Sequence, residues 1–326
     1  IFMNKVVMIT EYSLNESNGS ILRVKRQVEG LKENNLNNVS IMDNFNKNSI
    51  KPKDSLIHAQ QLTGKFFEKK TYIVDIHGIA ELETKAKTLQ YPYSSWKKWG
   101  YHVKSYQYKK LENKVWSNAL HLICASDAIY DRVKNIQNAT IVRPAVKIDE
   151  FNTTKCNKLR VAVVGPFLPG TQNYDWKLIS FCLKKLPEIE FVFIGTADKF
   201  FKEKLNLPNS TFLGKVENYA ESLSSCSVLL APYPEFSHII GSKTKMLEAG
   251  ACKMPVITTP QGALGMPEDS IIVCKSNKEF VDRLQYLKDE QARQDYGEKF
   301  QKIVKEKYNA DIEIKKLIRV YKEFLN

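Results

Sequence analysis

Residues 230–266 contain glycines, lysines and a glutamate at positions where an apolar run leads into a loop, a helix and a second apolar run. The N-terminus of a helix presents unpaired N–H groups and a partial positive charge, so a glycine there lets an anion such as a diphosphate approach closely. Lysines in the first turn add positive charge, and a carboxylate further along can accept hydrogen bonds from sugar hydroxyls. We therefore predict a nucleotide-diphosphate site built from Gly241, Ser242, Lys243, Lys245 and Glu248. For Lys243, a position on a solvated helix face is the alternative.

A histidine at the end of a predicted strand is the second candidate for chemistry. His77 directly follows the apolar run 72–76, in the sequence Asp75-Ile76-His77-Gly78. In open α/β sheets, ligands bind beyond the carboxyl ends of the strands, and an imidazole placed there can move protons. We predict a functional role for His77, and a purely structural histidine is the alternative.

Length and composition limit the class of protein. A chain of 326 residues exceeds the usual single core and predicts two domains of about 150 residues each. No run approaches the roughly 20 apolar residues that span a bilayer, and the first residues do not resemble a secretory signal. The six cysteines are far apart and lack metal-ligand spacing. We therefore expect reduced, buried thiols, no metal site and a cytoplasmic protein.

The net charge of +13 favours anionic partners. The densest segment, Tyr91 to Trp116, contains six lysines, one acidic residue and eight tyrosines or tryptophans. One interpretation is a helix with an aromatic face in the core and lysines in solvent. The other is association with an anionic membrane surface on the cytoplasmic face, where amphipathic rings lie at headgroup level. Nucleic acid is a weaker alternative, because no RNA- or DNA-binding motif accompanies the segment.

Strand-like and helix-like segments alternate along the chain, which predicts an α/β fold with parallel sheets and helices on both faces. The predicted strands of the first half are 5–10, 39–42, 56–59, 72–76, 121–125 and 140–142, and its helices are 21–32, 81–90, 98–117 and 126–136. The pattern restarts with strands 159–164, 191–194, 211–213, 228–231, 256–258 and 271–273, a helix at 174–186 and a helical tail broken near Asp289 and Asn309. We predict two Rossmann-like, doubly wound domains, residues 1–150 and 156–309, that face each other across a cleft.

These motifs together resemble the GT-B-fold glycosyltransferases, in particular the retaining family 4, also called glycosyl transferases group 1. That family's C-terminal signature is an apolar strand ending in proline, a glycine loop, Lys-x-x-Glu-Ala on a helix, then Pro-Val and Gly-x-x-Gly. The matching residues are Pro232, Gly241, Lys245 to Ala249, Lys253 to Val256 and Gly262 to Gly265. Shorter matches are Asn18-Gly19 to Val24, Asp75 to His77, Gly165 with Asn173, Phe193 to Gly195 and Phe212 to Val216.

The resemblance implies roles for individual residues. Glu248 would bind the ribose hydroxyls of a sugar nucleotide. Lys245 and Lys243, with the backbone near Gly241 and Ser242, would neutralise the departing diphosphate, and His77 would contact the transferred sugar or the acceptor hydroxyl. Further donor contacts are implied at Gly19, Ser20, Gly165 and Val216, and acceptor or anion contacts at Arg23 and His238. The resemblance also implies that a C-terminal helix at about 310–326 packs back on the first domain.

The sequence departs from the family pattern at two places. Ile240 stands where many members have a second glutamate, so that donor contact is lost or is made by backbone amides or by His238. The basic residues that commonly follow the first strand of the donor domain are replaced here by Pro166 and Asn173. These departures leave the donor sugar unassigned.

We therefore expect a cytoplasmic, metal-independent glycosyltransferase without a cofactor. It would move a sugar from a nucleotide-diphosphate sugar to a glycan or lipid-linked acceptor, with retention of configuration. One alternative is a sugar-nucleotide epimerase of the same architecture, which could recruit Asp75, Glu81 or Glu83 as acid and base. The other is a non-enzymatic nucleotide- or nucleic-acid-binding protein. A GxGxxG fingerprint is absent from the sequence, which disfavours an NAD-dependent dehydrogenase.

Overall fold

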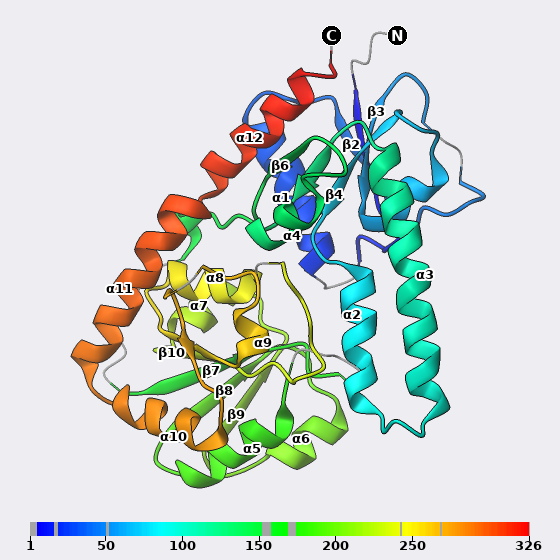
Figure 1. Ribbon diagram of the computed structural model, residues 1–326. Helices are drawn as coiled ribbons and strands as arrows, with labels where there is room; N and C mark the ends of the chain where they lie inside the picture. The colour runs from blue at the N-terminus through cyan, green and yellow to red at the C-terminus, as the bar shows by residue number, and fades with distance from the viewer. Residues whose placement is uncertain are drawn as a thin grey trace. The chain divides into compact units, whose positions relative to one another are not determined.

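The computed structural model describes residues 5–15, 19–49, 52–151, 158–168, 174–241, 243–267 and 269–325. The chain divides into two compact units, each built around one parallel sheet (Figure 1). The N-terminal unit comprises Ile1–Ala145, His238–Ser242 and Ala310–Asn326, and the C-terminal unit comprises Val146–Ser237 and Lys243–Asn309. Asn173 and Ser242, which carried sequence predictions, lie outside the described residues.

The sheet of the N-terminal unit has six parallel strands in the order β2-β1-β3-β4-β5-β6. The strands are β1 (Val6–Ile9), β2 (Val39–Met42), β3 (Leu56–Gln60), β4 (Tyr72–Ile76), β5 (Leu122–Cys124) and β6 (Ala139–Ile141). The central strands β1, β3, β4 and β5 are buried along their whole length. A parallel strand covered by helices on both faces reads as an uninterrupted apolar run, which is why the sequence located these strands.

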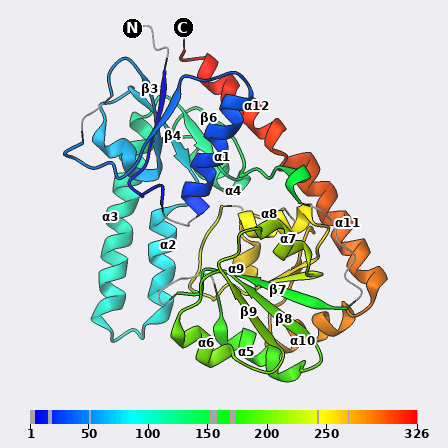
Figure 2. The same ribbon diagram turned by 180° about the vertical axis from the view of Figure 1, so that it is seen from behind.

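Helices of the N-terminal unit cover this sheet. They are α1 (Gly19–Glu33), η1 (Gln61–Phe66), α2 (Ala80–Ala86), η2 (Lys87–Gln90), α3 (Trp96–Asn118), α4 (Asp127–Val133) and α12 (Ala310–Lys322). Apolar residues at helical spacing on α1, such as Val24 and Leu31, share one core with Leu317 and Tyr321 of α12. Figure 2 shows α1 and α12 side by side against the sheet. The last helix is therefore part of the N-terminal core.

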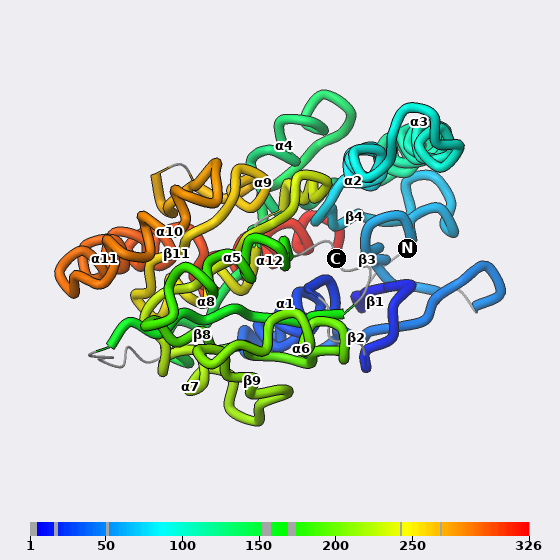
Figure 3. The backbone as a smooth tube through the Cα atoms, turned by 90° about the horizontal axis from the view of Figure 1, so that it is seen from below, coloured from blue at the N-terminus to red at the C-terminus, as the bar shows by residue number. Residues whose placement is uncertain are grey.

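Helix α3 and helix α2 form a hairpin that a buried carboxylate holds together. Glu112 of α3 is 2% exposed, and its oxygens accept hydrogen bonds from the backbone N–H groups of Ala80 at 2.6 Å and Glu81 at 3.2 Å. These donors belong to the first turn of α2, where the N-cap residue Ile79 makes no side-chain cap. Glu112 thus caps α2 from a neighbouring helix. Figures 1 and 3 show the two helices side by side.

The exposure of α3 contradicts one of the two interpretations of this segment, that its aromatic face lies in the core. Trp96, Trp99 and Tyr106 are 77%, 63% and 59% exposed, whereas Trp116 is 3% exposed. Only the C-terminal part of the helix reaches the core of the sheet. The sequence could not distinguish the two faces, because apolar residues lie on both.

The sheet of the C-terminal unit also has six parallel strands, in the order β12-β11-β10-β7-β8-β9. They are β7 (Arg160–Val164), β8 (Glu190–Ile194), β9 (Ser210–Gly214), β10 (Val228–Ala231), β11 (Val256–Thr258) and β12 (Ile272–Val273). The helical elements are η3 (Ile148–Glu150), α5 (Trp176–Lys185), α6 (Lys199–Leu205), α7 (Tyr219–Ser224), α8 (Thr244–Ala251), α9 (Pro260–Ala263), α10 (Asn277–Tyr286) and α11 (Glu290–Lys307). The two breaks predicted in the C-terminal helical tail are confirmed between α10, α11 and α12. Among the described helices, none is long and apolar enough to cross a membrane.

Candidate active site

In the C-terminal unit, helix α8 and the residue before it carry the lysines and the glutamate of the predicted diphosphate site. Strand β10 ends at Ala231, and a loop leads to Lys243, the residue before α8. Lys245 and Glu248 are three residues apart and therefore lie on one face of the helix. The sequence prediction thus places three charged groups within one helical segment.

Lys245 is held by aromatic residues from two other elements. Its Nζ lies 2.6 Å from Tyr174 Oη and 3.4 Å from the carbonyl oxygen of Val164, the last residue of β7. The same atom lies 4.2 Å from the ring centroid of Tyr174 and 4.9 Å from that of Tyr233. An ammonium group over aromatic faces is stabilised by the ring quadrupole, more so when it is shielded from water. These contacts fix the position of the amine.

The same surroundings make the charged form of Lys245 costly. Burial and, to a smaller extent, the positive charge of Lys243 lower the pKa of Lys245 to about 7, while Glu248 opposes the shift. A lysine with a pKa near neutrality gains most from an anionic ligand, because the ligand replaces the lost hydration of the ammonium. A strongly shifted pKa is typical of functional sites.

Lys243 is buried rather than solvated. The residue is 6% exposed, and its Nζ donates a hydrogen bond to the carbonyl oxygen of Leu264. The amine also lies 5.7 Å from the ring centroid of Tyr233. The alternative of a solvated helix face for Lys243 is therefore wrong. Two ammonium groups, from Lys243 and Lys245, share the ring of Tyr233.

Glu248 is 4% exposed and accepts a hydrogen bond of 3.0 Å from Tyr219 Oη. Tyr219 is the first residue of α7, and the negative charge of Glu248 adds to burial in raising the pKa of the phenol. A buried carboxylate is stable only with hydrogen-bond donors, and ribose hydroxyls could complete the set that Tyr219 begins. Sequence reasoning missed Tyr174, Tyr219 and Tyr233, since no spacing rule connects them to α8.

Two further predicted donor residues lie in the C-terminal unit. Gly165 follows β7, and its N–H donates to the carbonyl of Ile194 at 2.7 Å. A Cβ on Gly165 would lie 2.8 Å from the ring of Phe167, so the backbone is closely approached there. Val216 lies half-buried between β9 and α7, the helix that carries Tyr219.

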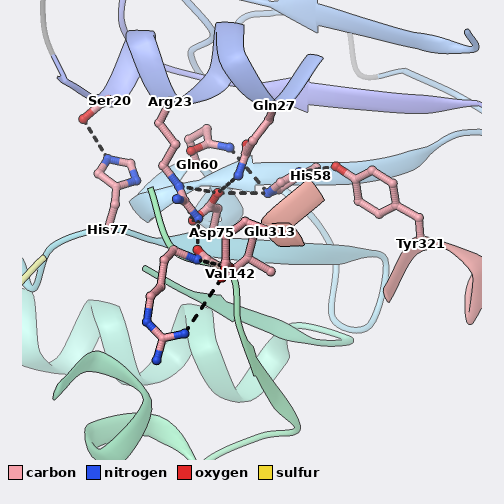
Figure 4. A network of polar contacts seen from close by, with 11 residues as sticks. Ser20, Arg23, Gln27, His58, Gln60, Asp75, His77, Val142, Glu313 and Tyr321 are labelled. Atoms are coloured by element: carbon pink, nitrogen blue, oxygen red, sulfur yellow. Dashed lines mark hydrogen bonds and ion pairs between the residues drawn. The ribbon is translucent and has the colours of Figure 1, made fainter. Parts of the chain in front are cut away.

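In the N-terminal unit, His77 lies at the end of β4, as the sequence predicted. Its Nε2 lies 2.7 Å from Ser20 Oγ in the first turn of α1, a helix that begins at Gly19 (Figure 4). Its buried Nδ1 has no hydrogen-bond partner. Burial lowers the pKa of His77 to about 4, with the charge of Arg23 adding to the shift and that of Asp75 opposing it. The imidazole is therefore neutral at physiological pH.

Arg23 and Asp75 form a buried ion pair rather than a ligand site. Arg23 Nε lies 2.9 Å from Asp75 Oδ2, its Nη2 lies 3.0 Å from Oδ1, and Asp75 is fully buried (Figure 4). Gln27 Nε2 donates to the same carboxylate at 2.8 Å, and Arg23 also donates to the carbonyl of Val142 at 2.7 Å. Burial alone would raise the pKa of Asp75, but Arg23 and His58 hold it far below its ordinary range. In the structure, the guanidinium of Arg23 thus binds the carboxylate of Asp75, whereas the sequence predicted a contact with an anionic donor or acceptor.

A second histidine joins this network and was not predicted. His58 Nδ1 lies 2.6 Å from Tyr321 Oη of α12, and its Nε2 lies 3.6 Å from Asp75 Oδ2. Arg143 N donates to Glu313 of the same helix at 2.7 Å. Figure 4 shows these groups converging from β3, β4, α1 and α12. The network attaches the C-terminal helix to the strand that ends at His77.

The segment His238–Ser242 belongs to the N-terminal unit. Ser126 Oγ donates a hydrogen bond of 2.8 Å to the carbonyl of Ile240, which is 7% exposed. A Cβ on Gly241 would lie 2.4 Å from the carbonyl oxygen of His77, so only glycine fits. Gly241 therefore brings the predicted diphosphate loop against His77, and Ile240 fills a buried position where many similar enzymes have a glutamate. His238 is half-buried in this segment.

Within the described ranges, no cluster of three or more His, Cys, Asp or Glu residues could hold a metal ion. Lys243 and Lys245 place two buried ammonium groups in the C-terminal unit.

Residues 158–290 match the family model described as Glycosyl transferases group 1. This span contains all six strands of the C-terminal sheet together with α8. No curated protein matches the chain in sequence. The family match therefore covers the unit that carries Lys243, Lys245 and Glu248.

Solved structures of similar fold extend over nearly the whole chain. Sucrose-phosphate synthase from Thermosynechococcus elongatus aligns with a TM-score of 0.75 at 13% identity, covering 98% of this chain and 99% of that chain. HepE from Anabaena, solved in complex with UDP-glucose, aligns with a TM-score of 0.70 at 12% identity, covering 98% and 99%. WaaG, a glycosyltransferase involved in lipopolysaccharide biosynthesis, aligns with a TM-score of 0.67 at 13% identity, covering 96% and 99%. Both units thus share the GT-B fold of these solved structures, and residues 158–290 match the family model of glycosyl transferases group 1.

Proposed function

We propose that the enzyme binds a nucleotide-diphosphate sugar on its C-terminal unit and transfers the sugar to a glycan or lipid-linked acceptor. The observation that carries this proposal is the pair of buried amines, Lys243 and Lys245, beside the buried carboxylate Glu248. Two cations suit a diphosphate, and a carboxylate three residues further along suits the ribose hydroxyls. The solved complex of HepE with UDP-glucose supports a nucleotide sugar as the donor class.

In the transfer step, the bond between the anomeric carbon and the diphosphate oxygen breaks, and a bond from the acceptor oxygen to the same carbon forms. Negative charge develops on the departing diphosphate, and its oxygen accepts the proton that the acceptor hydroxyl gives up. Lys245 and Lys243 would stabilise that charge without a divalent ion, because fixed cations in a site shielded from water act strongly on a leaving group. Binding the diphosphate would raise the pKa of Lys245 and keep the amine protonated during transfer.

His77 is proposed to contact the transferred sugar or the acceptor hydroxyl. Its neutral imidazole can accept or donate a hydrogen bond, and the unpartnered Nδ1 leaves one such position open. Retention of configuration is part of the proposal and follows from the likeness to group 1. Gly19 and Ser20 are proposed as further backbone contacts to the diphosphate.

A ligand screen tests the donor. UDP, GDP, ADP and dTDP, each free and as a hexose conjugate, are added to the protein and the melting temperature is measured. A nucleotide at 100 times its dissociation constant stabilises the native state by about 2.7 kcal/mol. A rise with one nucleotide in the wild type that Lys245→Met abolishes supports the site, whereas no rise with any of them contradicts it. Repeating the measurement with EDTA tests metal independence.

A product assay separates transfer from epimerisation. The donor is incubated without an acceptor, and the sugar nucleotide is analysed by chromatography and NMR. Conversion to an epimer without release of nucleotide diphosphate would overturn the transferase mechanism proposed here. The fully buried ion pair of Asp75 with Arg23 argues against an acid–base role for that carboxylate.

A further inference from the structure

Large apolar side chains lie in solvent along the hairpin of α2, η2 and α3. On α3, Trp96, Trp99, Val103 and Tyr106 are 77%, 63%, 58% and 59% exposed. Their spacing of three, four and three residues places them on one face of the helix. Leu89 and Tyr93, which precede α3, are 63% and 83% exposed. We name these six residues the hairpin face.

The core does not use this face. The buried residues of α3 are Ser105, Glu112, Val115 and Trp116. At 100° per residue, they lie on the side of the helix opposite the stripe that runs from Trp96 to Tyr106. The hairpin is thus anchored through one side of α3 while the other side presents rings to solvent. Monomeric proteins seldom expose contiguous apolar side chains of this kind unless they bind something.

The charge around the hairpin face has a single sign. Between Glu83 and Glu112 the sequence contains seven lysines and no acidic residue. The lysines are Lys85, Lys87, Lys97, Lys98, Lys104, Lys109 and Lys110. Three of them lie over rings of the face: Lys98 at 3.5 Å from the Tyr93 centroid, Lys110 at 4.6 Å from the Tyr106 centroid and Lys97 at 5.9 Å from the Trp96 ring. An occupant of this surface must be apolar in part and negatively charged.

We propose that the hairpin face binds the surface of an anionic lipid bilayer. Tryptophan and tyrosine rings favour the headgroup region, where an apolar body and a polar edge are both satisfied. The flanking lysines meet anionic headgroups, and their long stems let the ammonium groups stay in the aqueous layer. A helix with apolar rings on one face and lysines beside them lies in the interface plane.

Other occupants fit the charge less well. A second copy of this chain would place one lysine-rich hairpin against another, and like charges would oppose the contact. A nucleic acid would satisfy the lysines and could stack on the rings, but Leu89 and Val103 offer it no stacking face. The bilayer is the partner that uses the aliphatic, aromatic and cationic groups together.

Binding to a bilayer is a function separate from the transfer reaction. Membrane binding would keep the enzyme at the surface where a lipid-linked acceptor resides. It does not depend on the donor chemistry, because it is measured without donor or acceptor. Failure of vesicle binding would leave the proposed transfer intact, and failure of the transfer would leave vesicle binding intact.

The test is co-sedimentation with vesicles of phosphatidylcholine alone and of phosphatidylcholine with about 30% phosphatidylglycerol, a strongly anionic mixture. One variant is Trp96→Ala/Trp99→Ala. A second is Lys97→Gln/Lys104→Gln/Lys109→Gln/Lys110→Gln. The control for the tryptophan variant is Tyr286→Ala/Ile312→Ala, because these two residues lie outside the hairpin and are 53% and 42% exposed. The control for the lysine variant is Lys202→Gln/Lys302→Gln/Lys305→Gln/Lys307→Gln. Circular dichroism melts check that each variant is folded.

We expect the wild type and both controls to bind the anionic vesicles. The tryptophan variant should lose about tenfold in partitioning, since each ring withdraws a large apolar area from water. Each lysine near an anionic surface raises partitioning onto the vesicles by about fivefold, so the lysine variant should partition about a hundredfold or more weakly than the wild type. Salt should weaken binding of the wild type. Equal binding by all variants, or none by the wild type, overturns the proposal. The bilayer proposal would also be overturned if the wild type bound no vesicles but bound single-stranded RNA, or formed dimers, and the same variants lost that binding. RNA or a second copy of the chain would then be the partner of the hairpin face.

Discussion

The amine of Lys245 lies 2.6 Å from the hydroxyl of Tyr174, although 71 residues separate the two in sequence. Tyr174 lies just before α5 and Lys245 lies on α8, so the contact forms only when both pack on the C-terminal sheet. The phenol is buried, and burial raises its pKa well above the ordinary value. It therefore stays protonated and can orient the amine without neutralising its charge.

Replacing Lys245 by methionine should change how stability depends on pH. The pKa of Lys245 is about 7 in the folded protein against an ordinary value of 10.5. Between these values the unfolded chain binds more protons, so the lysine makes wild-type stability rise with pH across this window. Lys245→Met lacks that rise. Its free energy of unfolding relative to wild type should therefore fall from pH 7 to pH 10, by at most about 1.4 kcal/mol per pH unit.

Urea denaturation at pH 6.5, 8 and 9.5 measures this difference. Lys202→Met is the matched control, since Lys202 is exposed on α6. A constant difference between Lys245→Met and wild type across the three values would show that the amine is not perturbed.

Replacing Glu248 by alanine should weaken binding of the donor nucleotide by about tenfold to a hundredfold, because hydrogen bonds to a charged group are worth about 1.5–3 kcal/mol. The 2′-deoxy form of the same nucleotide separates a ribose contact from a general loss. Wild type should discriminate against the deoxy form, and Glu248→Ala should not. Isothermal titration calorimetry gives all four affinities. Glu217→Ala, at an exposed position of the same unit, is the control. Undiminished discrimination in Glu248→Ala would refute the ribose contact.

Replacing His77 by asparagine should make the enzyme less sensitive to acid. The pKa of His77 is lowered from 6.5 to about 4, so the unfolded chain binds the extra proton first as the pH falls. Wild-type stability is complete above pH 6.5 and declines toward pH 4, and His77→Asn should lack this part of the decline. Thermal melts from pH 4 to pH 7.5 test this. Turnover at pH 7.5 should drop by about a hundredfold or more if His77 contacts the reacting groups.

A matched variant separates the two effects of His77. Ser20→Ala removes the 2.7 Å contact with Nε2 but keeps the imidazole. We expect it to reduce turnover less than His77→Asn does. Equal turnover in wild type and His77→Asn would limit His77 to a structural role.

Replacing Glu112 should affect the anchoring of the hairpin. Glu112→Ala leaves the N–H groups of Ala80 and Glu81 without an acceptor and should cost about 2 kcal/mol of stability. Burial raises the pKa of Glu112 from 4.5 to about 7, so the folded protein holds a proton that the unfolded chain has lost, and stability falls as pH rises across this range. Glu112→Gln has no group that ionises there, so its free energy of unfolding should rise relative to that of the wild type as the pH increases from 4.5 to 7. Chemical denaturation at pH 5 and pH 7.5 measures this, and a gain that shrinks with pH would contradict it.

The sequence predicted the strands better than the surfaces. The bounds of β2, β4, β10 and β11 coincide with the predicted ones. Strands β4, β10 and β11 are buried along their whole length, and such parallel strands are largely apolar runs. For α3 the sequence left two interpretations open, since Trp96, Trp99, Val103 and Tyr106 repeat with the same period that a core-facing helix shows. Periodicity identifies an apolar face but does not say what covers it.

The charged residues of the site were likewise easier to predict than their partners. Lys243, Lys245 and Glu248 lie in one helical segment, so their spacing was visible. Their hydrogen-bonding tyrosines, and the contact of His58 with Tyr321 across 263 residues, depend on tertiary packing. Arg23 was predicted beside an anion, and the anion in the structure is the protein's own Asp75.

The contribution of α12 to the N-terminal unit has a consequence for synthesis on the ribosome. Tyr321 and Glu313 bond to His58 and Arg143, so residues 1–145 cannot complete their core until α12 has also been translated. The C-terminal unit, which ends at Asn309, has by then already emerged. The half of the enzyme that is made first is therefore finished last, and a nascent chain that stalls before α12 would expose the apolar faces of α1 and the sheet to chaperones.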